Sequence, residues 1–222
     1  GITMKHLNQV FEKLDYDYST FTLPDFTDQI AGFVRKEILL IPRMLEKTLS
    51  GIWVHQQTAH YVFYNNQLHI ILQFHAILHE MAHMWFGNLV TKDWWNGLWL
   101  NESFATLMSD IAVSTIPEFK DLWHDFYLST TLAAISADKM VSTHPIEVPV
   151  PSSDDFFAVF DAITYEKGAS VLNQLSHFVV QENFRLGVSN YLKEHAWGNT
   201  ELADFISAQA EQSGQPLSAW SK

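Results

Sequence analysis

The residues most able to do chemistry in this 222-residue chain are His79, Glu80 and His83, which read H-E-x-x-H. They fall within residues 67–86, whose apolar spacing predicts a helix. Residues four apart lie on one face of a helix, so both imidazoles can reach one metal ion. Glu80 lies about 100° further round, where it can accept a proton from an attacking water instead of binding the ion. A pair of hydrogen-bonded core histidines is the alternative interpretation of these letters.

A catalytic zinc ion takes three protein ligands and keeps one position open, so a third ligand must come from elsewhere. Glu102 follows His83 with 18 residues between them, inside a second predicted helix over residues 98–114. A carboxylate is costly to bury in apolar surroundings unless a cation compensates its charge. Glu102 is therefore the candidate third ligand, against the alternative of a surface residue on an amphipathic helix. Three tryptophans make its neighbourhood apolar: Trp94, Trp95 and Trp99.

The elements that must position these residues are expected to be mostly helical, with a small β component near the N-terminus. Turn signals at Gly87-Asn88 and Asn96-Gly97 separate the first two helices. A strand is expected over residues 37–41, and residues 51–66 form a strand or part of a helix. The fold class is thus α+β, and no repeat or linker divides residues 1–222 into more than one domain. Further helices are expected over residues 3–14, 117–137, 163–181, 183–195 and 200–212, with a loop over 141–155.

The composition excludes several classes of protein. The chain is 47% hydrophobic and 17% charged, which is enough apolar material for a sizeable core. It has no cysteine, so disulfides, cysteine-ligated metals and a thiol nucleophile are all excluded. Its formal net charge of −12 argues against a general nucleic-acid partner and against an anionic membrane surface. No apolar run approaches the roughly 18 residues that a transmembrane helix needs.

The segment HEMAHMWFGNLVTKDWWNGLWLNESFA, residues 79–105, resembles the signature of the M1 family of zinc aminopeptidases, the gluzincins related to aminopeptidase N. The stretch Thr164–Ala169 and the segment YLKEHAWGNTELADF are also similar to that family. The resemblance implies a thermolysin-like zinc metallopeptidase domain that removes N-terminal amino acids from peptides. It implies one zinc ion held by His79, His83 and Glu102. The same resemblance implies Glu80 as the general base and Tyr165 as the hydroxyl donor to the tetrahedral intermediate.

The sequence departs from the family at the amine-binding site. Family members carry a G-x-M-E-N segment whose glutamate binds the free α-amine of the substrate, and no such segment is present here. Glu37 and Asp28 are weak substitutes, with solvated surface charges as the alternative. The family often places a glutamate seven residues beyond the third ligand, where Ser109 stands, and the adjacent Asp110 is the candidate carboxylate for orienting a zinc-bound histidine.

Two further hypotheses remain open beside the aminopeptidase. One is a zinc hydrolase without specificity for a free amine. The other is a metal-binding domain with a structural or interaction role, for which His75 would be the expected fourth ligand. The resemblance further implies a piece of a larger enzyme, with an N-terminal β domain and a C-terminal helical domain that dock on it. We expect peptides as partners, no nucleic acid and no membrane segment, and a cytoplasmic location.

Overall fold

The structure is a computed structural model that describes residues 37–44, 51–55, 59–65, 67–115, 119, 121–152 and 159–221. The helix expected over residues 3–14 and the candidate Asp28 lie outside these ranges. The chain divides into two compact units. One contains residues 1–81 and 108–123, and the other contains residues 82–107 and 124–222. The described elements are mostly helical with small sheets, as the sequence predicts.

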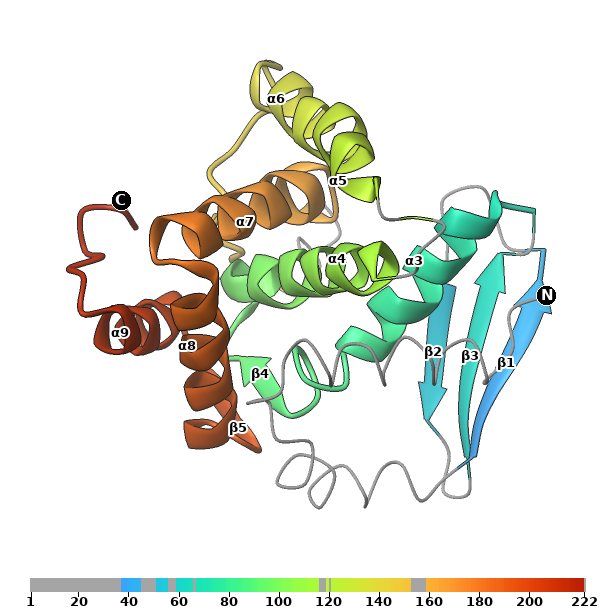
Figure 1. The fold of residues 1–222 in the computed structure, drawn as a ribbon, viewed down its shortest axis with the longest axis horizontal. Helices are drawn as coiled ribbons and strands as arrows, with labels where there is room; N and C mark the ends of the chain where they lie inside the picture. Colours follow the sequence, from blue (N-terminus) through green and yellow to red (C-terminus); the bar gives the residue numbers. More distant parts are fainter. Residues whose placement is uncertain are drawn as a thin grey trace. The chain divides into compact units, whose positions relative to one another are not determined.

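The first unit contains a three-stranded sheet in the order β1-β3-β2 (Figure 1). β3 pairs parallel with β1, from Glu37 opposite Ala59 to Arg43 opposite Asn65, and antiparallel with β2. Gly51, the first residue of β2, is buried against α3, close to the Ala76 carbonyl. Residues 51–66, expected to form a strand or part of a helix, contain two strands. The elements are β1 (Glu37–Arg43), β2 (Gly51–His55), β3 (Ala59–Asn65) and α3 (Ile70–Ala82).

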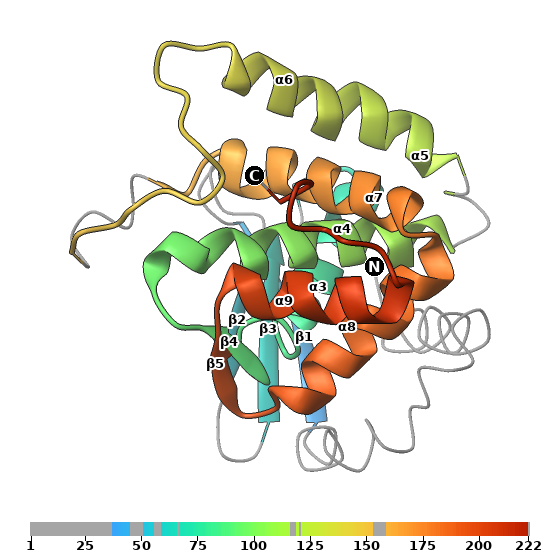
Figure 2. The same cartoon turned by 90° about the vertical axis from the view of Figure 1, so that its left-hand side faces the viewer.

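The second unit packs around an aromatic core. Phe104 of α4 is 1% exposed and stacks on Phe86, with 4.3 Å between ring centroids. Phe205 meets Phe104 edge-on at 5.1 Å. Helices α8 and α9 lie side by side in both views (Figures 1 and 2). The elements are β4 (Val90–Lys92), α4 (Leu98–Ser114, of which residues 98–107 belong to this unit), α7 (Gly168–Phe178), α8 (Gln181–Glu194), β5 (Gly198–Thr200) and α9 (Leu202–Ser213).

Two helices predicted from the sequence contain wide, π-helical turns. The helix expected over residues 117–137 is built as a short α5, a π-helical segment and α6. The helix expected from residue 163 begins with a π-helical turn that runs directly into α7. The bounds are α5 (Leu122–Asp125), the π-helical segment Phe126–Thr131, α6 (Leu132–Asp138) and the π-helical turn Ile163–Lys167.

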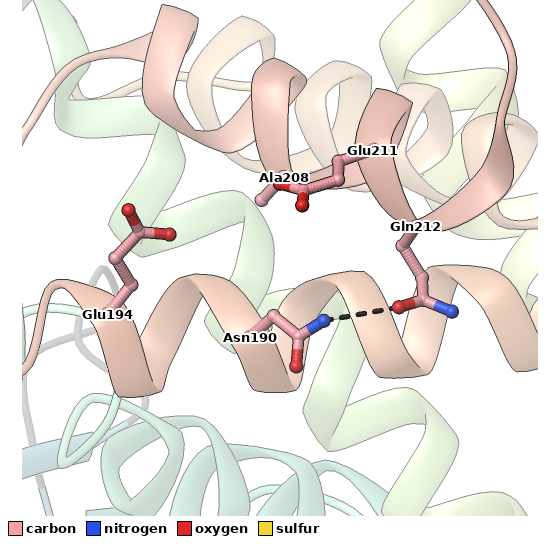
Figure 3. A pocket seen from close by; sticks show the side chains of 5 residues that line it. All are labelled: Asn190, Glu194, Ala208, Glu211 and Gln212. Atoms are coloured by element: carbon pink, nitrogen blue, oxygen red, sulfur yellow. Dashed lines mark hydrogen bonds between the residues drawn. The ribbon is translucent and has the colours of Figure 1, made fainter.

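A hollow of about 440 Å³ lies between α8 and α9 (Figure 3). Asn190 donates a hydrogen bond to Gln212 across it, and the carboxylates of Glu194 and Glu211 stand on its walls. Among the residues that the structure describes, those lining the hollow belong to no group of possible metal ligands. In the part of the chain that the structure describes, no helix has the length and apolar character needed to cross a membrane.

Candidate metal centre

α3 and the turn after it carry the H-E-x-x-H residues. The helix buries Phe74, Ile77 and Met81 on one side, while His79 and Glu80 stay partly exposed. It ends at Ala82, four residues earlier than the periodicity predicts, so that His83 opens a turn. Asn88 N–H donates to the His83 carbonyl at 3.0 Å, and this bond closes the turn.

The imidazole of His83 is held by a backbone carbonyl. Its Nδ1 lies 3.0 Å from the carbonyl oxygen of Phe86, which can only accept a hydrogen bond. Nδ1 therefore carries the proton in this contact, and the lone pair on Nε2 is left for a ligand. Nε2 lies 3.3 Å from Oε2 of Glu102. The turn thus orients the imidazole so that the nitrogen able to bind a metal faces the carboxylate.

Glu102 projects from the first half of α4, whose neighbouring residues are locked into the aromatic core. The side chain of Glu102 is 12% exposed, and Phe104 two residues later is almost fully buried. A carboxylate this enclosed needs a positive partner. The rigid helix fixes its direction, because Phe104 cannot rotate without opening the core.

His79, His83 and Glu102 form a group that could hold a metal ion. Each offers one ligand atom, and these three atoms lie within 4.8 Å of one another. Two imidazole nitrogens and one carboxylate oxygen are a donor set that suits zinc. The three residues predicted as ligands are therefore brought together, by one helix with its following turn and by α4.

Lys92, which no motif in the sequence singles out, lies near this carboxylate. Lys92 is half-buried at the end of β4, with its ammonium 4.6 Å from the centre of the Trp95 ring. Burial lowers the pKa of Lys92, while the negative charge of Glu102 acts in the opposite direction. Glu102 thus contributes to keeping a half-buried cation charged. No periodicity in the sequence signals this contact.

The predicted base, Glu80, is confined by the sheet. A Cβ atom on Gly51 would lie 3.0 Å from Cγ of Glu80 and 3.2 Å from its Oε1. Any side chain at position 51 would therefore push Glu80 out of place. No pattern in the sequence connects Gly51 with this helix.

Tyr165 lies in the π-helical turn before α7. Ser103 Oγ donates to the Thr164 carbonyl at 2.6 Å. One hydrogen bond therefore joins the residue after Glu102 to the residue before Tyr165. Gly168 lies against the same serine, because a Cβ there would be 2.8 Å from the Ser103 Cβ and would also overlap its hydroxyl. Ser103 and Gly168 together set how closely the turn approaches α4.

We expect Gly168→Ala to lower the free energy of unfolding by about 2 kcal/mol, because the added methyl group overlaps Ser103. Helix propensity alone predicts the opposite sign, a gain of about 1 kcal/mol when alanine replaces glycine. Urea denaturation of the two proteins measures the difference. An unchanged or raised stability would mean that α4 and the turn are not in this close contact.

Asp110 is placed beside His75. Its Oδ1 lies 3.0 Å from His75 Nδ1, and Ser109 Oγ lies 3.1 Å from the same nitrogen. Ser109 Oγ also lies 3.4 Å from His75 Nε2, farther than from the Nδ1 that faces Asp110, so the serine and the aspartate are not on opposite sides of the imidazole as in a Ser-His-Asp triad. The imidazole of His75 stacks on that of His79 with 6.1 Å between centroids. The predicted role of Asp110 toward a zinc-bound histidine stays a prediction.

Glu37 is the first residue of β1 and is paired with Ala59 through the backbone. Asp28 lies outside the described residues.

Comparison with known proteins identifies relatives of the chain. Residues 57–221 match the family described as the peptidase family M1 domain. The chain is 38% identical to an aminopeptidase N of Streptomyces lividans over 225 aligned residues, which cover 100% of this chain. It is 49% identical over 142 residues to a Tricorn protease-interacting factor F2 of Thermoplasma volcanium, and 44% identical over 143 residues to an aminopeptidase 2 of Candida albicans. Each of these two alignments covers 64% of the chain.

The chain is much shorter than these relatives. It spans 25% of the Streptomyces protein, 18% of the Thermoplasma protein and 15% of the Candida protein.

Proposed function

The chain belongs to peptidase family M1, and from that premise we propose that it is a zinc-dependent aminopeptidase. It would remove N-terminal amino acids from peptides by attack of an activated water on the scissile carbonyl. The observation that carries the proposal is the group of His79, His83 and Glu102, whose ligand atoms lie within 4.8 Å of one another. The names of two relatives described above, an aminopeptidase N and an aminopeptidase 2, support the same reaction class.

The residues present fit a zinc ion. His83 has its Nδ1 engaged by the Phe86 carbonyl, which leaves Nε2 available, and Glu102 offers a largely enclosed carboxylate. His79 supplies the third donor. When bound, zinc would polarise the scissile carbonyl and lower the pKa of water to about 7.

The remaining chemistry would be done by Glu80 and Tyr165. Glu80 would accept a proton from the attacking water and then pass it to the leaving amine, which is the work of a general acid and base. Confinement by Gly51 favours one position of its carboxylate. Tyr165 would donate its hydroxyl proton in a hydrogen bond to the developing oxyanion. The Phe160 ring lies beside the Tyr165 ring, with 6.3 Å between the ring centroids.

Recognition of the substrate amine would differ from that of the family. The G-x-M-E-N segment is absent from the sequence, and Glu37 and Asp28 are the proposed substitutes. This absence favours a second candidate function, which is a zinc hydrolase of the same mechanism without specificity for a free amine.

Hydrolysis of paired substrates tests the proposal. The zinc-loaded chain is given aminoacyl arylamides with a free amine, beside N-acetylated versions of the same compounds. We expect kcat/KM to be at least about 100-fold higher for the free-amine set, because a site built for a charged group rejects the analogue that lacks it. Equal cleavage of both sets would support the second candidate function. No cleavage of either set by a chain that holds zinc would contradict peptidase activity of this chain.

A further inference from the structure

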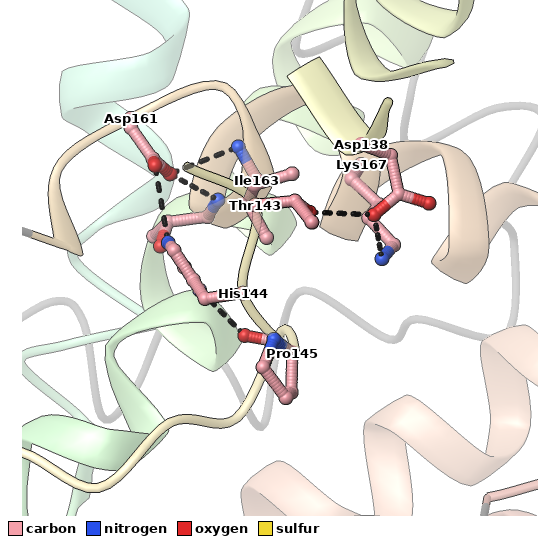
Figure 4. Close-up of polar contacts among 8 residues, drawn as sticks. Asp138, Thr143, His144, Pro145, Asp161, Ile163 and Lys167 are labelled. Carbon is pink, nitrogen blue, oxygen red and sulfur yellow. Dashed lines mark hydrogen bonds and ion pairs between the residues drawn. The ribbon is translucent and has the colours of Figure 1, made fainter. Parts of the chain in front are cut away.

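The turn that carries Tyr165 is bonded to the loop that precedes it at two places (Figure 4). The loop leaves α6 at Asp138 and contains His144. His144 pairs with Asp161 on one side of Tyr165, and Asp138, the last residue of α6, pairs with Lys167 on the other. The two contacts differ in what they hold, and that difference indicates which of them controls the tyrosine.

Asp161 holds the backbone of the turn. Its Oδ1 accepts hydrogen bonds from the N–H groups of Ile163 at 2.9 Å and Thr164 at 3.2 Å. The first N–H groups of a helix have no partner within the helix, and a carboxylate at that end satisfies them and interacts favourably with the helix dipole. Tyr165 N–H donates to the Asp161 carbonyl at 3.1 Å. Asp161 therefore fixes three consecutive backbone groups that end at Tyr165.

His144 in turn holds Asp161. Its Nε2 lies 3.0 Å from Oδ2 of Asp161, the oxygen that does not cap the turn. Its Nδ1 lies 2.6 Å from the carbonyl oxygen of Pro145. The His144 side chain is 17% exposed, whereas that of Asp161 is 38% exposed. The enclosed imidazole thus gives the more exposed carboxylate a fixed partner on the side away from the turn.

The second contact holds only a side chain. Lys167 Nζ donates to Oδ1 of Asp138 at 2.6 Å, and Thr143 Oγ1 donates to the same oxygen at 3.0 Å. The hydrogen bond from Lys167 is the main cause that lowers the pKa of Asp138. Because a lysine side chain is long and flexible, this ion pair constrains the backbone at Tyr165 far less than the Asp161 contacts do.

We propose that His144 is a positioning residue for Tyr165, acting through Asp161 to fix the turn from which the phenol projects. The inference rests on the proposed function, in which Tyr165 donates to the oxyanion. Ser103 holds the Thr164 carbonyl from α4, and Asp161 holds the Thr164 N–H, so the peptide groups on both sides of Thr164 are bonded. Loss of His144 frees the Asp161 carboxylate to swing toward solvent and loosens the second of these restraints.

Kinetics of His144→Ala test the proposal, with Asp138→Asn at the end of α6 as the matched control. We expect His144→Ala to lower kcat by about 10-fold to about 100-fold with KM within about twofold, because misplacing a group that acts in the transition state costs rate rather than substrate binding. Asp138→Asn should leave both constants within about twofold. In a Tyr165→Phe background, His144→Ala should add less than about twofold, because both changes remove one function.

A second readout follows Tyr165 without relying on activity. The chain has seven tyrosines, and ¹⁹F NMR of protein labelled with 3-fluorotyrosine gives each a resonance, with Tyr165 assigned by Tyr165→Phe. The Tyr165 resonance should shift or broaden in His144→Ala and stay in place in Asp138→Asn. His144→Gln, whose amide N–H can still donate to Asp161, should restore the resonance and most of kcat.

Two results would overturn the proposal: an unmoved Tyr165 resonance in folded His144→Ala, or a loss of kcat that adds in full to that of Tyr165→Phe. A moved resonance in a chain that cleaves no substrate would keep the positioning role and contradict the proposed function instead. If His144→Ala does not fold, Asp161→Asn replaces it. The asparagine Oδ1 still accepts the two N–H bonds while the charge that faces His144 is lost, so a smaller shift of the same resonance is expected.

Discussion

Glu80→Gln is expected to reduce kcat for hydrolysis of a free-amine arylamide by about 1,000-fold, while the zinc content stays at about one ion per chain. Glutamine has the shape of glutamate but cannot accept the proton of the attacking water. It also fits beside Gly51, where the space is too tight for a larger change. Arylamide hydrolysis by the zinc-loaded protein gives kcat, and metal analysis of the same sample gives the zinc content per chain.

The matched control for this variant is Glu194→Gln. Glu194 lies at the end of α8, on the wall of the hollow between α8 and α9, and belongs to no group of metal ligands (Figure 3). Its amide variant should keep kcat within about twofold. If Glu80→Gln retained more than about a tenth of the activity, another group would have to be the base, since general bases contribute at least about 100-fold.

Glu102→Ala is expected to abolish stoichiometric zinc binding and, with it, hydrolysis. Changes in groups that only orient metal ligands already weaken metal binding about 10-fold to about 100-fold, so loss of a direct ligand should exceed about 100-fold. Competition with a chromophoric chelator gives the dissociation constant. In the wild-type chain, removal of zinc by a stronger chelator should stop hydrolysis, and added zinc should restore it.

A readout of stability makes this test independent of activity. A ligand present at about 100 times its dissociation constant stabilises the folded chain by about 2.7 kcal/mol. Zinc should therefore raise the melting temperature of the wild-type chain and of Glu194→Gln, but not that of Glu102→Ala. An equal shift in all three proteins would mean that the ion binds outside the group of His79, His83 and Glu102.

The helix that presents Glu102 could be predicted from the sequence, whereas the end of the preceding helix could not. α4 spans residues 98–114 as its apolar residues and the turn at Asn96-Gly97 predict. The periodicity of α3 continues through Trp85 and Phe86, but the helix stops at Ala82. The chain that follows Ala82 turns back, because Gly87 has a φ of +129° and Phe86 forms a β-bridge with Val90. Apolar residues in a buried turn look like helix residues in the sequence.

Local sequence patterns could not predict contacts between segments that lie far apart in the chain. β4 pairs in parallel with β5, more than a hundred residues later, and neither three-residue strand has a period to read. No residue pattern in the sequence predicts the π-helical turns at Phe126–Thr131 and Ile163–Lys167. The three candidate ligands came from spacing along the chain, but Tyr165 came only from family resemblance. Its supports in the fold, Ser103, His144 and Gly168, became visible only through the structure.

The π-helical turn at Ile163–Lys167 also has a consequence for changes in chain length. Lys167 N–H bonds to the Ala162 carbonyl five residues back, so the turn holds one residue more than an α-helical turn. Each residue of an α-helix advances by about 100°, and deleting one residue here would move Thr164 or Glu166 into the direction that Tyr165 now takes. Replacing a side chain in this segment leaves that direction intact. The backbone geometry of the turn therefore tolerates substitutions better than insertions or deletions. Apart from Tyr165, it constrains the number of residues between Asp161 and Gly168 more than their identity.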